Sequence, residues 1–321
     1  MTEIPTAGGT VDSGALGRTL CHEHVFVLTP DVQQNYPDEW DEERRVAEAI
    51  EKLTALKANG IDTIFDPTVV GLGRYIPRIV RIAAQVDLNI VVATGVYTYD
   101  EVPSFFRMRG PIFGLDLPEP MVPLFVRDLT EGIAGTGVRA AFLKCAVDAR
   151  GMVEGVERVL RAVIGAHQQT GAPIMVHTDS RERRGLDVDA VIRETGVDPK
   201  HVMLAHCGDS ADVDHLTELG ERGYFLGMDR FGIDVYLPFE QRVETVAEMC
   251  RRGFAEQMLL AHDAACYIDW IDPAFAPMSP NWHYLHVTND VLPALRERGV
   301  SDEQIETMMI DNPRRWITAS A

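Results

Sequence analysis

Metal-ligating side chains recur along this sequence at the ends of short apolar segments. His22 and His24 are two residues apart, so both side chains would lie on the same face of a strand. His177 and His206 end two later apolar segments, and Asp263 ends the last one. Neutral imidazole and carboxylate are ligands of zinc and related divalent ions. These five side chains exceed the needs of one four-coordinate ion, whereas two ions about 3.5–4 Å apart would use them all.

Two ions also need a bridging group, and Lys144 stands inside the apolar segment AFLKCAV. A lysine ammonium has no lone pair and repels cations, but a desolvated lysine loses its proton readily. The neutral amine can react with carbon dioxide to give a carbamate, a carboxylate-like anion long enough to bridge two ions. The alternatives for Lys144 are a side chain that snorkels at a strand edge and a Schiff-base nucleophile.

Other polar side chains in similar places are expected to be structural. A single histidine at a strand end is most often a hydrogen-bonded structural residue, so the metal site is predicted from the residues acting together. Asp66 precedes Pro67 and is expected to support the site rather than bind an ion, and Asp229 ends a predicted strand without an assigned role. Five more histidines are not expected to bind metal, because they lie in helical stretches, at the opposite end of a strand or after a loop. They are His167, His215, His201, His283 and His286.

Eight short apolar or β-branched segments alternate with stretches of helical period and are predicted to be strands. They are RTLCHEHVF (18–26), IDTIFDPTV (61–69), NIVVATGVY (89–97), RAAFLKCAV (139–147), APIMVHT (172–178), HVMLAHC (201–207), GYFLGMD (223–229) and QMLLAHD (257–263). Apolar residues three and four apart predict helices at 41–59 and 240–252. Ser301 and Gln304 have the spacing of a capping box, and Asn312-Pro313 predicts the end of the last helix.

Continuous apolar strands that alternate with helices indicate parallel strands buried on both faces. A doubly wound open sheet also fits, but it usually has a glycine-rich turn after its first strand, and here that strand contains Cys21-His22-Glu23-His24. The count of eight favours an α/β fold of the (β/α)8 TIM-barrel type, with residues 1–321 as a single domain and 1–18 as an N-terminal lead-in. The carboxyl ends of all strands meet at one mouth of such a barrel, which makes residues as distant as His22 and Asp263 neighbours.

Composition narrows the class of protein. The chain has 321 residues, of which 46% are hydrophobic, and this composition argues against a disordered protein. Its formal charge is −19 without a basic cluster, which argues against nucleic acid or anionic membranes as partners. No apolar segment approaches the roughly 18 residues of a membrane span, and the first residues lack the pattern of a signal peptide. Five cysteines without paired spacing argue against a disulfide framework. We therefore expect a cytoplasmic protein.

Six motifs, in order, resemble those of the phosphotriesterase-like lactonases of the amidohydrolase superfamily: TLCHEHVF, FLKCA, VHT, LAHCGDS, GMDRFG and AHDAACYIDW. The resemblance runs from about Gly17 to Trp316, includes GLGRYIP (71–77) and PNW (280–282), and is greatest to actinobacterial members that open N-acyl homoserine lactones. It implies a distorted (β/α)8 barrel with two divalent metal ions, zinc first, with cobalt, iron and manganese as alternatives. Two segments depart from the family pattern, the charged DSRERRG (179–185) and the loop 103–120.

The resemblance also implies roles for individual residues. The more buried ion would be held by His22, His24 and Asp263, and the more exposed ion by His177 and His206. Carboxylated Lys144 and a hydroxide would bridge the two ions. Tyr97 would orient the substrate or its leaving oxygen, while Arg230 and Asp209 would relay protons with Asp263. The substrate pocket would be lined by Leu72, Tyr97, Arg230, Ile233, Val235, Trp270 and Trp282.

The predicted function is therefore metal-dependent hydrolysis of a lactone ring, with N-acyl homoserine lactones (quorum quenching) as substrates and phosphotriesterase activity as a side reaction. One alternative is a hydrolase that acts primarily on organophosphates or other esters, and another is a barrel that binds metal or a lactone without turnover. A Schiff-base barrel built on Lys144 ranks below these because it leaves four histidines without a task. The family implies a homodimer, and the only other partner expected is a small lactone or ester.

Overall fold

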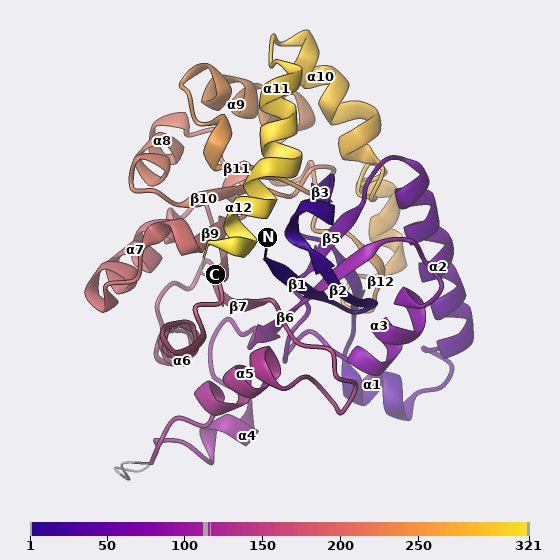
Figure 1. The fold of residues 1–321 in the computed structure, drawn as a ribbon, viewed down its shortest axis with the longest axis vertical. Coiled ribbons are helices and arrows are strands. Elements are labelled where there is room, and N and C mark those ends of the chain that lie inside the picture. The colour runs from indigo at the N-terminus through magenta and orange to yellow at the C-terminus, as the bar shows by residue number, and fades with distance from the viewer. Residues whose placement is uncertain (1, 112–114, 116, 320–321) are drawn as a thin grey trace.

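Eight parallel strands form the centre of the molecule in a computed structural model that describes residues 2–111, 115 and 117–319. In the described part of the chain their order is β11-β10-β9-β8-β7-β6-β5-β3 (Figure 1). The two outermost strands meet where the Cys21 amide donates to the Leu260 carbonyl at 3.3 Å, so the sheet closes almost completely. This confirms the predicted single-domain (β/α)8 barrel. Its strands are β3 (Thr19–Leu20), β5 (Thr63–Asp66), β6 (Asn89–Gly95), β7 (Phe142–Val147), β8 (Ile174–Thr178), β9 (Val202–Ala205), β10 (Phe225–Met228) and β11 (Met258–Leu260).

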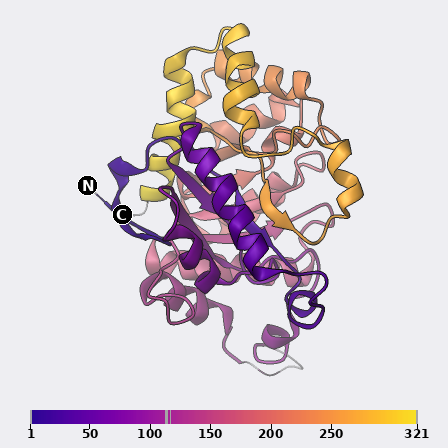
Figure 2. The ribbon, with the colours of Figure 1, turned by 90° about the vertical axis from the view of Figure 1, so that its right-hand side faces the viewer.

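Helices surround this barrel (Figures 1 and 2). The predicted helices at 41–59 and 240–252 are confirmed, and Asp41 begins the first by accepting a hydrogen bond from the Arg44 amide at 3.0 Å. No helix among the described residues is both long and apolar enough to cross a membrane. The helices are α1 (Pro30–Asn35), α2 (Glu42–Ala58), α3 (Ile76–Ala83), α4 (Ser104–Arg107), α5 (Met121–Thr130), α6 (Glu154–Thr170), α7 (Arg184–Thr195), α8 (Val213–Glu221), α9 (Phe239–Arg251), α10 (Leu292–Glu297), α11 (Asp302–Glu306) and α12 (Asn312–Thr318).

The last helix does not end at Asn312-Pro313, so that prediction is wrong. The capping box of Ser301 and Gln304 is present, but α11 continues through a π-helical segment, Thr307–Asp311, directly into α12. The π turn changes the hydrogen-bond register, and Pro313 falls in the first turn of α12, where a missing N–H is tolerated. The buried Asn312 amide fixes this turn by donating to the carbonyls of Ala255 and Met258, each at 2.7 Å.

The first predicted strand is divided in the structure. Residues Thr19–Leu20 belong to the barrel as β3, whereas His24–Val27 form β4, which pairs in parallel with β12 (Ala265–Ile268). The chain bends between them, and the Glu23 amide donates to the Phe65 carbonyl at 2.9 Å. The ribbon of β4 and β12 therefore continues from the carboxyl ends of the first and last barrel strands.

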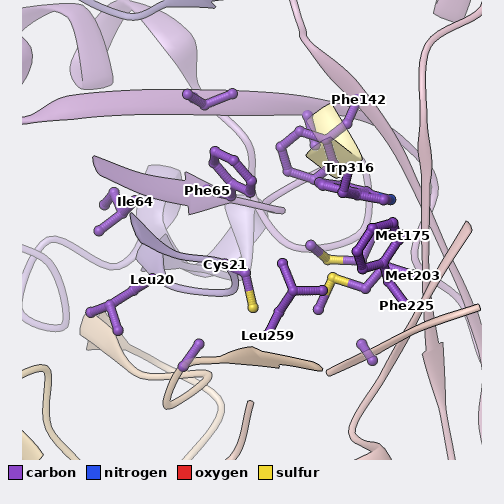
Figure 3. Packing of buried hydrophobic residues seen from close by; sticks show 14 of the residues in the cluster. Leu20, Cys21, Ile64, Phe65, Phe142, Met175, Met203, Phe225, Leu259 and Trp316 are labelled. Carbon is purple, nitrogen blue, oxygen red and sulfur yellow. The ribbon is translucent and has the colours of Figure 1, made fainter. Parts of the chain in front are cut away.

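The amino end of the barrel is closed by apolar side chains. Trp316 of α12 is fully buried, with its ring centroid 5.8 Å from that of Phe65 and 5.5 Å from that of Phe142 (Figure 3). The lead-in forms a hairpin of β1 (Glu3–Thr6) and β2 (Gly9–Asp12), and it lies beside the C-terminal helix at this end (Figure 2). Apolar packing at one end leaves the opposite end of the strands for polar side chains.

Replacing Trp316 with alanine should lower the free energy of unfolding by about 3–5 kcal/mol, because a large buried ring is removed from the barrel floor. The measurement is the urea midpoint and slope of the metal-free protein. Trp270→Ala is the matched control, since that ring is 45% exposed, and its midpoint should stay close to that of the unchanged protein. Equal shifts of the urea midpoint in the two variants would contradict the stabilising role of Trp316 at the amino end of the barrel.

Candidate metal centre

Six potential metal ligands converge at the carboxyl end of the barrel strands. They come from five separate segments of the chain, and only the Asp263 side chain retains appreciable exposure, at 14%. β7 and β8 carry Lys144 and His177, and His24 begins β4. The other three lie just after the ends of β3, β9 and β11. The six are His22, His24, Lys144, His177, His206 and Asp263.

The donor atoms of these residues face one another. Oδ1 of Asp263 lies 3.3 Å from Nε2 of His22 and 3.2 Å from Nε2 of His24, so the three form one compact group. Nε2 of His206 lies 2.9 Å from Nδ1 of His177, and these two form a second group. The sequence prediction paired the residues in this way, and the chemistry of both groups suits a divalent metal ion.

Lys144 contacts the first group, and Asp263 contacts both groups. Nζ of Lys144 lies 3.4 Å from Nε2 of His22 in the first group. Oδ2 of Asp263 lies 3.7 Å from Nε2 of His206 in the second. A bridging ligand between two ions would have to occupy this central position.

Hydrogen bonds fix the outward-facing nitrogen of each histidine. The Asp229 carboxylate contacts Nδ1 of His22 at 2.7 Å and Nδ1 of His206 at 3.0 Å. Thr68 Oγ1 contacts Nδ1 of His24 at 2.7 Å. His22, His206 and Asp229 also have the spacing of a metal site, but these contacts are hydrogen bonds on the outer side of both rings. They leave Nε2 of each ring free to bind an ion.

His177 is held in the opposite orientation. Its Nε2 contacts the Asp148 carboxylate at 2.6 Å, and its Nδ1 faces the centre. Asp66 supports the site, as expected, because its carboxylate accepts a hydrogen bond from the Thr68 amide at 3.0 Å. Asp148, Asp229 and Thr68 thus act behind the predicted ligands.

The ionisation states of the cluster also suit metal binding. Burial lowers the pKa of His22 to about 4 and also lowers the pKa values of His177 and His206, so these imidazoles are neutral at neutral pH. Burial lowers the pKa of Lys144 to about 8. Burial opposes ionisation of Asp263, but the neighbouring imidazoles and the Arg230 guanidinium outweigh it and hold the pKa of that carboxyl well below its usual range.

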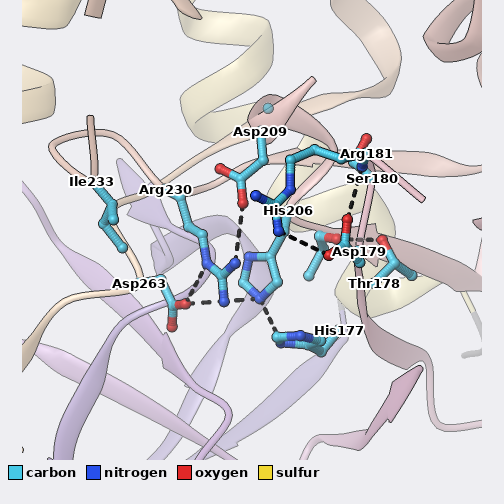
Figure 4. Close-up of polar contacts among 12 residues, drawn as sticks. His177, Thr178, Asp179, Ser180, Arg181, His206, Asp209, Arg230, Ile233 and Asp263 are labelled. Atoms are coloured by element: carbon cyan, nitrogen blue, oxygen red, sulfur yellow. Dashed lines mark hydrogen bonds and ion pairs between the residues drawn. The ribbon is translucent and has the colours of Figure 1, made fainter. Parts of the chain in front are cut away.

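A line of charged groups leads from the centre into the protein. Nε of Arg230 donates to Asp263 at 3.0 Å, and its Nη1 donates to Asp209 at 3.0 Å (Figure 4). The fully buried Arg242 donates to the other oxygen of Asp209 at 2.8 Å. Arg230 and Asp209, predicted from the motifs, are therefore joined to Asp263, and Arg242 extends the line.

A cavity of about 250 Å³ opens over these residues. Tyr97 borders it, with its hydroxyl 3.3 Å from Nδ1 of His177 and in contact with the Tyr99 hydroxyl. Burial raises the pKa of Tyr97 well above its usual range, so the hydroxyl keeps its proton. The predicted lining residues all border the cavity, namely Leu72, Tyr97, Arg230, Ile233, Val235, Trp270 and Trp282.

The sequence model of the phosphotriesterase family matches residues 2–317. The chain belongs to the phosphotriesterase family. It is 57% identical over 317 residues to the phosphotriesterase homology protein of Mycobacterium tuberculosis, with 98% of this chain and 97% of that protein covered. The solved structure of the phosphotriesterase from Mycobacterium tuberculosis matches with a TM-score of 0.96 and 57% identity over 98% of both chains. The aryldialkylphosphatase of Saccharolobus solfataricus is 33% identical over 319 residues, covering 98% of this chain and 99% of that protein.

The chain is therefore a hydrolase of the phosphotriesterase family, and the (β/α)8 barrel agrees with that assignment. The specificity for lactones stays a prediction.

The two segments that depart from the expected pattern lie near the cavity or partly outside the described residues. In the segment 179–185, the Arg181 guanidinium lies 5.0 Å from the ring centroid of Tyr236. Tyr236 lines the cavity, so this segment lies close to it. Figure 4 shows Arg181 beside Asp179, whose carboxylate it contacts at 3.0 Å. In 103–120, α4 is described, whereas 112–114 and 116 lie outside the described residues.

Asp229→Asn should weaken metal binding by about 10–100-fold, because His22 and His206 contact different oxygens of this carboxylate and an amide keeps only one of them as an acceptor. The measurement is metal content per chain after dialysis against graded concentrations of a chelator. Asp87→Asn is the control, since that carboxylate is 97% exposed and far from any predicted ligand. Retention of metal by Asp229→Asn at the level of the control would show that Asp229 does not orient the ligands.

Proposed function

We propose that this phosphotriesterase-family hydrolase uses two divalent metal ions to open lactone rings, with N-acyl homoserine lactones as the substrate class. The observation that carries the proposal is the cluster of four histidines, one lysine and one ionised aspartate beneath a largely apolar cavity. A lactone has a carbonyl group that such a centre activates. The acyl tail of an N-acyl homoserine lactone is apolar, like the wall of the cavity.

Each ion has its own ligands in this proposal. His22, His24 and Asp263 would hold one ion, and His177 and His206 the other, with zinc, cobalt, iron and manganese all compatible with this ligand set. Bound ions supply a nucleophile at neutral pH by lowering the pKa of water, and they polarise a carbonyl oxygen. Lys144 would bridge the ions as a carbamate: its nitrogen forms a bond to the carbon of carbon dioxide and releases a proton to solvent.

The protein's own residues then position the substrate and move protons. The Tyr97 hydroxyl, which keeps its proton, donates a hydrogen bond to an oxygen of the lactone. The Asp263 carboxylate accepts a proton from the attacking water and returns it to the ring oxygen as that oxygen leaves. Arg230 keeps its proton at all working pH values and holds Asp263 in place, while Asp209 holds the other side of the Arg230 guanidinium.

The substrate tail would lie along the apolar wall of the cavity. Leu72, Ile233 and Trp270 supply aliphatic and aromatic surface there, and Val235 lies at its exposed rim. Phosphotriesters are the second candidate substrate, because a tetrahedral phosphoryl centre suits the same groups and a 33% identical relative is named aryldialkylphosphatase.

The test is metal content per chain, on protein purified without chelator, beside the kcat/KM for an N-acyl homoserine lactone and for an aryl dialkyl phosphate. We expect two equivalents of metal and a higher kcat/KM for the lactone. A higher kcat/KM for the phosphotriester would favour the second candidate. Two bound ions without turnover of either substrate would favour a barrel that binds metal or a lactone without reacting.

Asp263→Asn should lower kcat for the lactone by about 10²–10⁴-fold, because the amide cannot accept the proton. The variant is assayed at metal concentrations that restore two ions per chain, so that a loss of ligand affinity does not imitate a loss of proton transfer. An unchanged kcat at full occupancy would rule out the proton-transfer role.

Reconstitution of metal-free protein should require bicarbonate and should accelerate as the pH rises through about 8. Burial lowers the pKa of Lys144 to about 8, so the neutral amine that reacts with carbon dioxide becomes the main form above that pH. The measurement is the rate at which activity returns after zinc is added, with and without bicarbonate. Lys144→Met is the control and should bind fewer than two ions under every condition. Borohydride trapping of substrate on Lys144 would support the Schiff-base alternative instead.

A further inference from the structure

Glu23 stands between two predicted ligands in the sequence, but its side chain does not join them. It is fully buried, and its carboxylate accepts three hydrogen bonds from the segment after β11. Oε1 accepts from the His262 amide at 2.9 Å and contacts His262 Nδ1 at 2.6 Å, and Oε2 accepts from the Ala264 amide at 3.0 Å. Glu23 therefore holds the residues immediately before and after Asp263.

Asp263 has a backbone conformation that needs this support. Its φ is +53°, in the left-handed region, which costs about 1–2 kcal/mol for a residue with a side chain. Such a conformation persists only where surrounding contacts impose it. The Asp263 amide donates to the His22 carbonyl at 3.0 Å, and Trp282 Nε1 donates to the carbonyl of Asp263 at 3.2 Å. With the bonds to Glu23, contacts hold the peptide groups on both sides of Asp263.

This conformation directs the Asp263 side chain to the metal centre. Its carboxylate lies within 3.3 Å of both His22 Nε2 and His24 Nε2, and it accepts the hydrogen bond from Arg230. A small rotation of the Asp263 backbone would move these oxygens away from the ligand group, because a short side chain cannot compensate for it.

His262 connects the same segment to the C-terminal helices. It is fully buried, and while its Nδ1 contacts Glu23, its Nε2 accepts a hydrogen bond from the Val287 amide at 2.8 Å. Val287 lies at the start of the helical segment that leads into α10, where amides lack partners within the helix. The two ring nitrogens therefore have different tasks, one toward Glu23 and one toward this helix.

We propose that Glu23 and His262 form a positioning pair that holds Asp263 in the left-handed conformation from which its carboxylate binds a metal ion. The inference rests on the proposed metal centre. Neither residue of the pair would touch the metal or the substrate, and both act through the Asp263 backbone. Weakening the pair should therefore affect the ion that Asp263 binds more than the ion that His177 and His206 bind.

Glu23→Gln tests the pair with little change of side-chain volume. The amide nitrogen replaces one acceptor oxygen, so one of the three N–H groups would face another donor. The affinity for one of the two zinc equivalents should fall by about 10–100-fold, and the other equivalent should keep nearly its original affinity. The measurement is zinc titration of the metal-free full-length protein in competition with a chromophoric chelator.

Two further variants separate positioning from the substitution itself and from folding. Glu51→Gln makes the same substitution at an exposed site on α2 and should leave both zinc affinities unchanged. His262→Asn keeps an N–H donor near Glu23 but loses the acceptor for Val287. It should lower the thermal stability of the metal-free protein, measured by circular dichroism, and leave zinc affinity close to that of the unchanged protein.

The outcomes separate this inference from the proposed function. If the unchanged protein fails to bind two zinc ions, the proposed metal centre is wrong. If the unchanged protein binds two zinc ions and Glu23→Gln binds both with the same affinities as the unchanged protein, the metal centre stands and the positioning pair is wrong. Equal weakening of both zinc equivalents, together with a loss of metal-free stability, would make Glu23 a general structural residue and would also overturn the inference.

Discussion

The candidate metal centre depends on one fully buried carboxylate that contacts two histidines from distant parts of the chain. Asp229 lies 207 residues from His22 in sequence, yet it contacts Nδ1 of both His22 and His206. Burial of a charge is unfavourable unless the charge is paired and hydrogen-bonded. Here burial alone would raise the pKa of Asp229, but the two imidazoles and their hydrogen bonds outweigh it and hold the pKa well below its usual range. Asp229 therefore stays ionised and leaves Nε2 of both rings free for metal.

The barrel separates stability from chemistry along its axis. Trp316 and its aromatic neighbours fill the amino end, and the ionisable groups gather at the carboxyl end (Figures 3 and 4). Two site residues, His206 and Asp263, have left-handed backbones, with φ of +67° and +53°. The conformational cost of these two residues is offset by buried hydrogen bonds around them and by the packed floor beneath.

Prediction from the sequence succeeded where the signal was local and repeated. Alternating strands and helices predicted the barrel, and the rule that parallel strands share one functional end predicted that the six candidate ligands would lie together. Prediction from the sequence failed where the same local sequence pattern is compatible with two different structures. Pro313 predicted a helix end, but a π turn lets the chain continue, and the first predicted strand divides into β3 and β4 because the chain bends around Glu23.

The residues that orient the ligands could not be found in the same way. Asp229 lies at a strand end like the candidate ligands, Asp148 follows its strand by one residue, and His262 precedes Asp263. The neighbouring sequence does not show which residue each of them contacts. Their partners lie in other strands, so their roles exist only once the barrel has closed. Periodicity and ligand chemistry are properties of short segments and can be read from sequence. The choice of which histidine nitrogen faces the centre of the site, and the left-handed backbone of Asp263, come from contacts between segments that only the folded chain brings together.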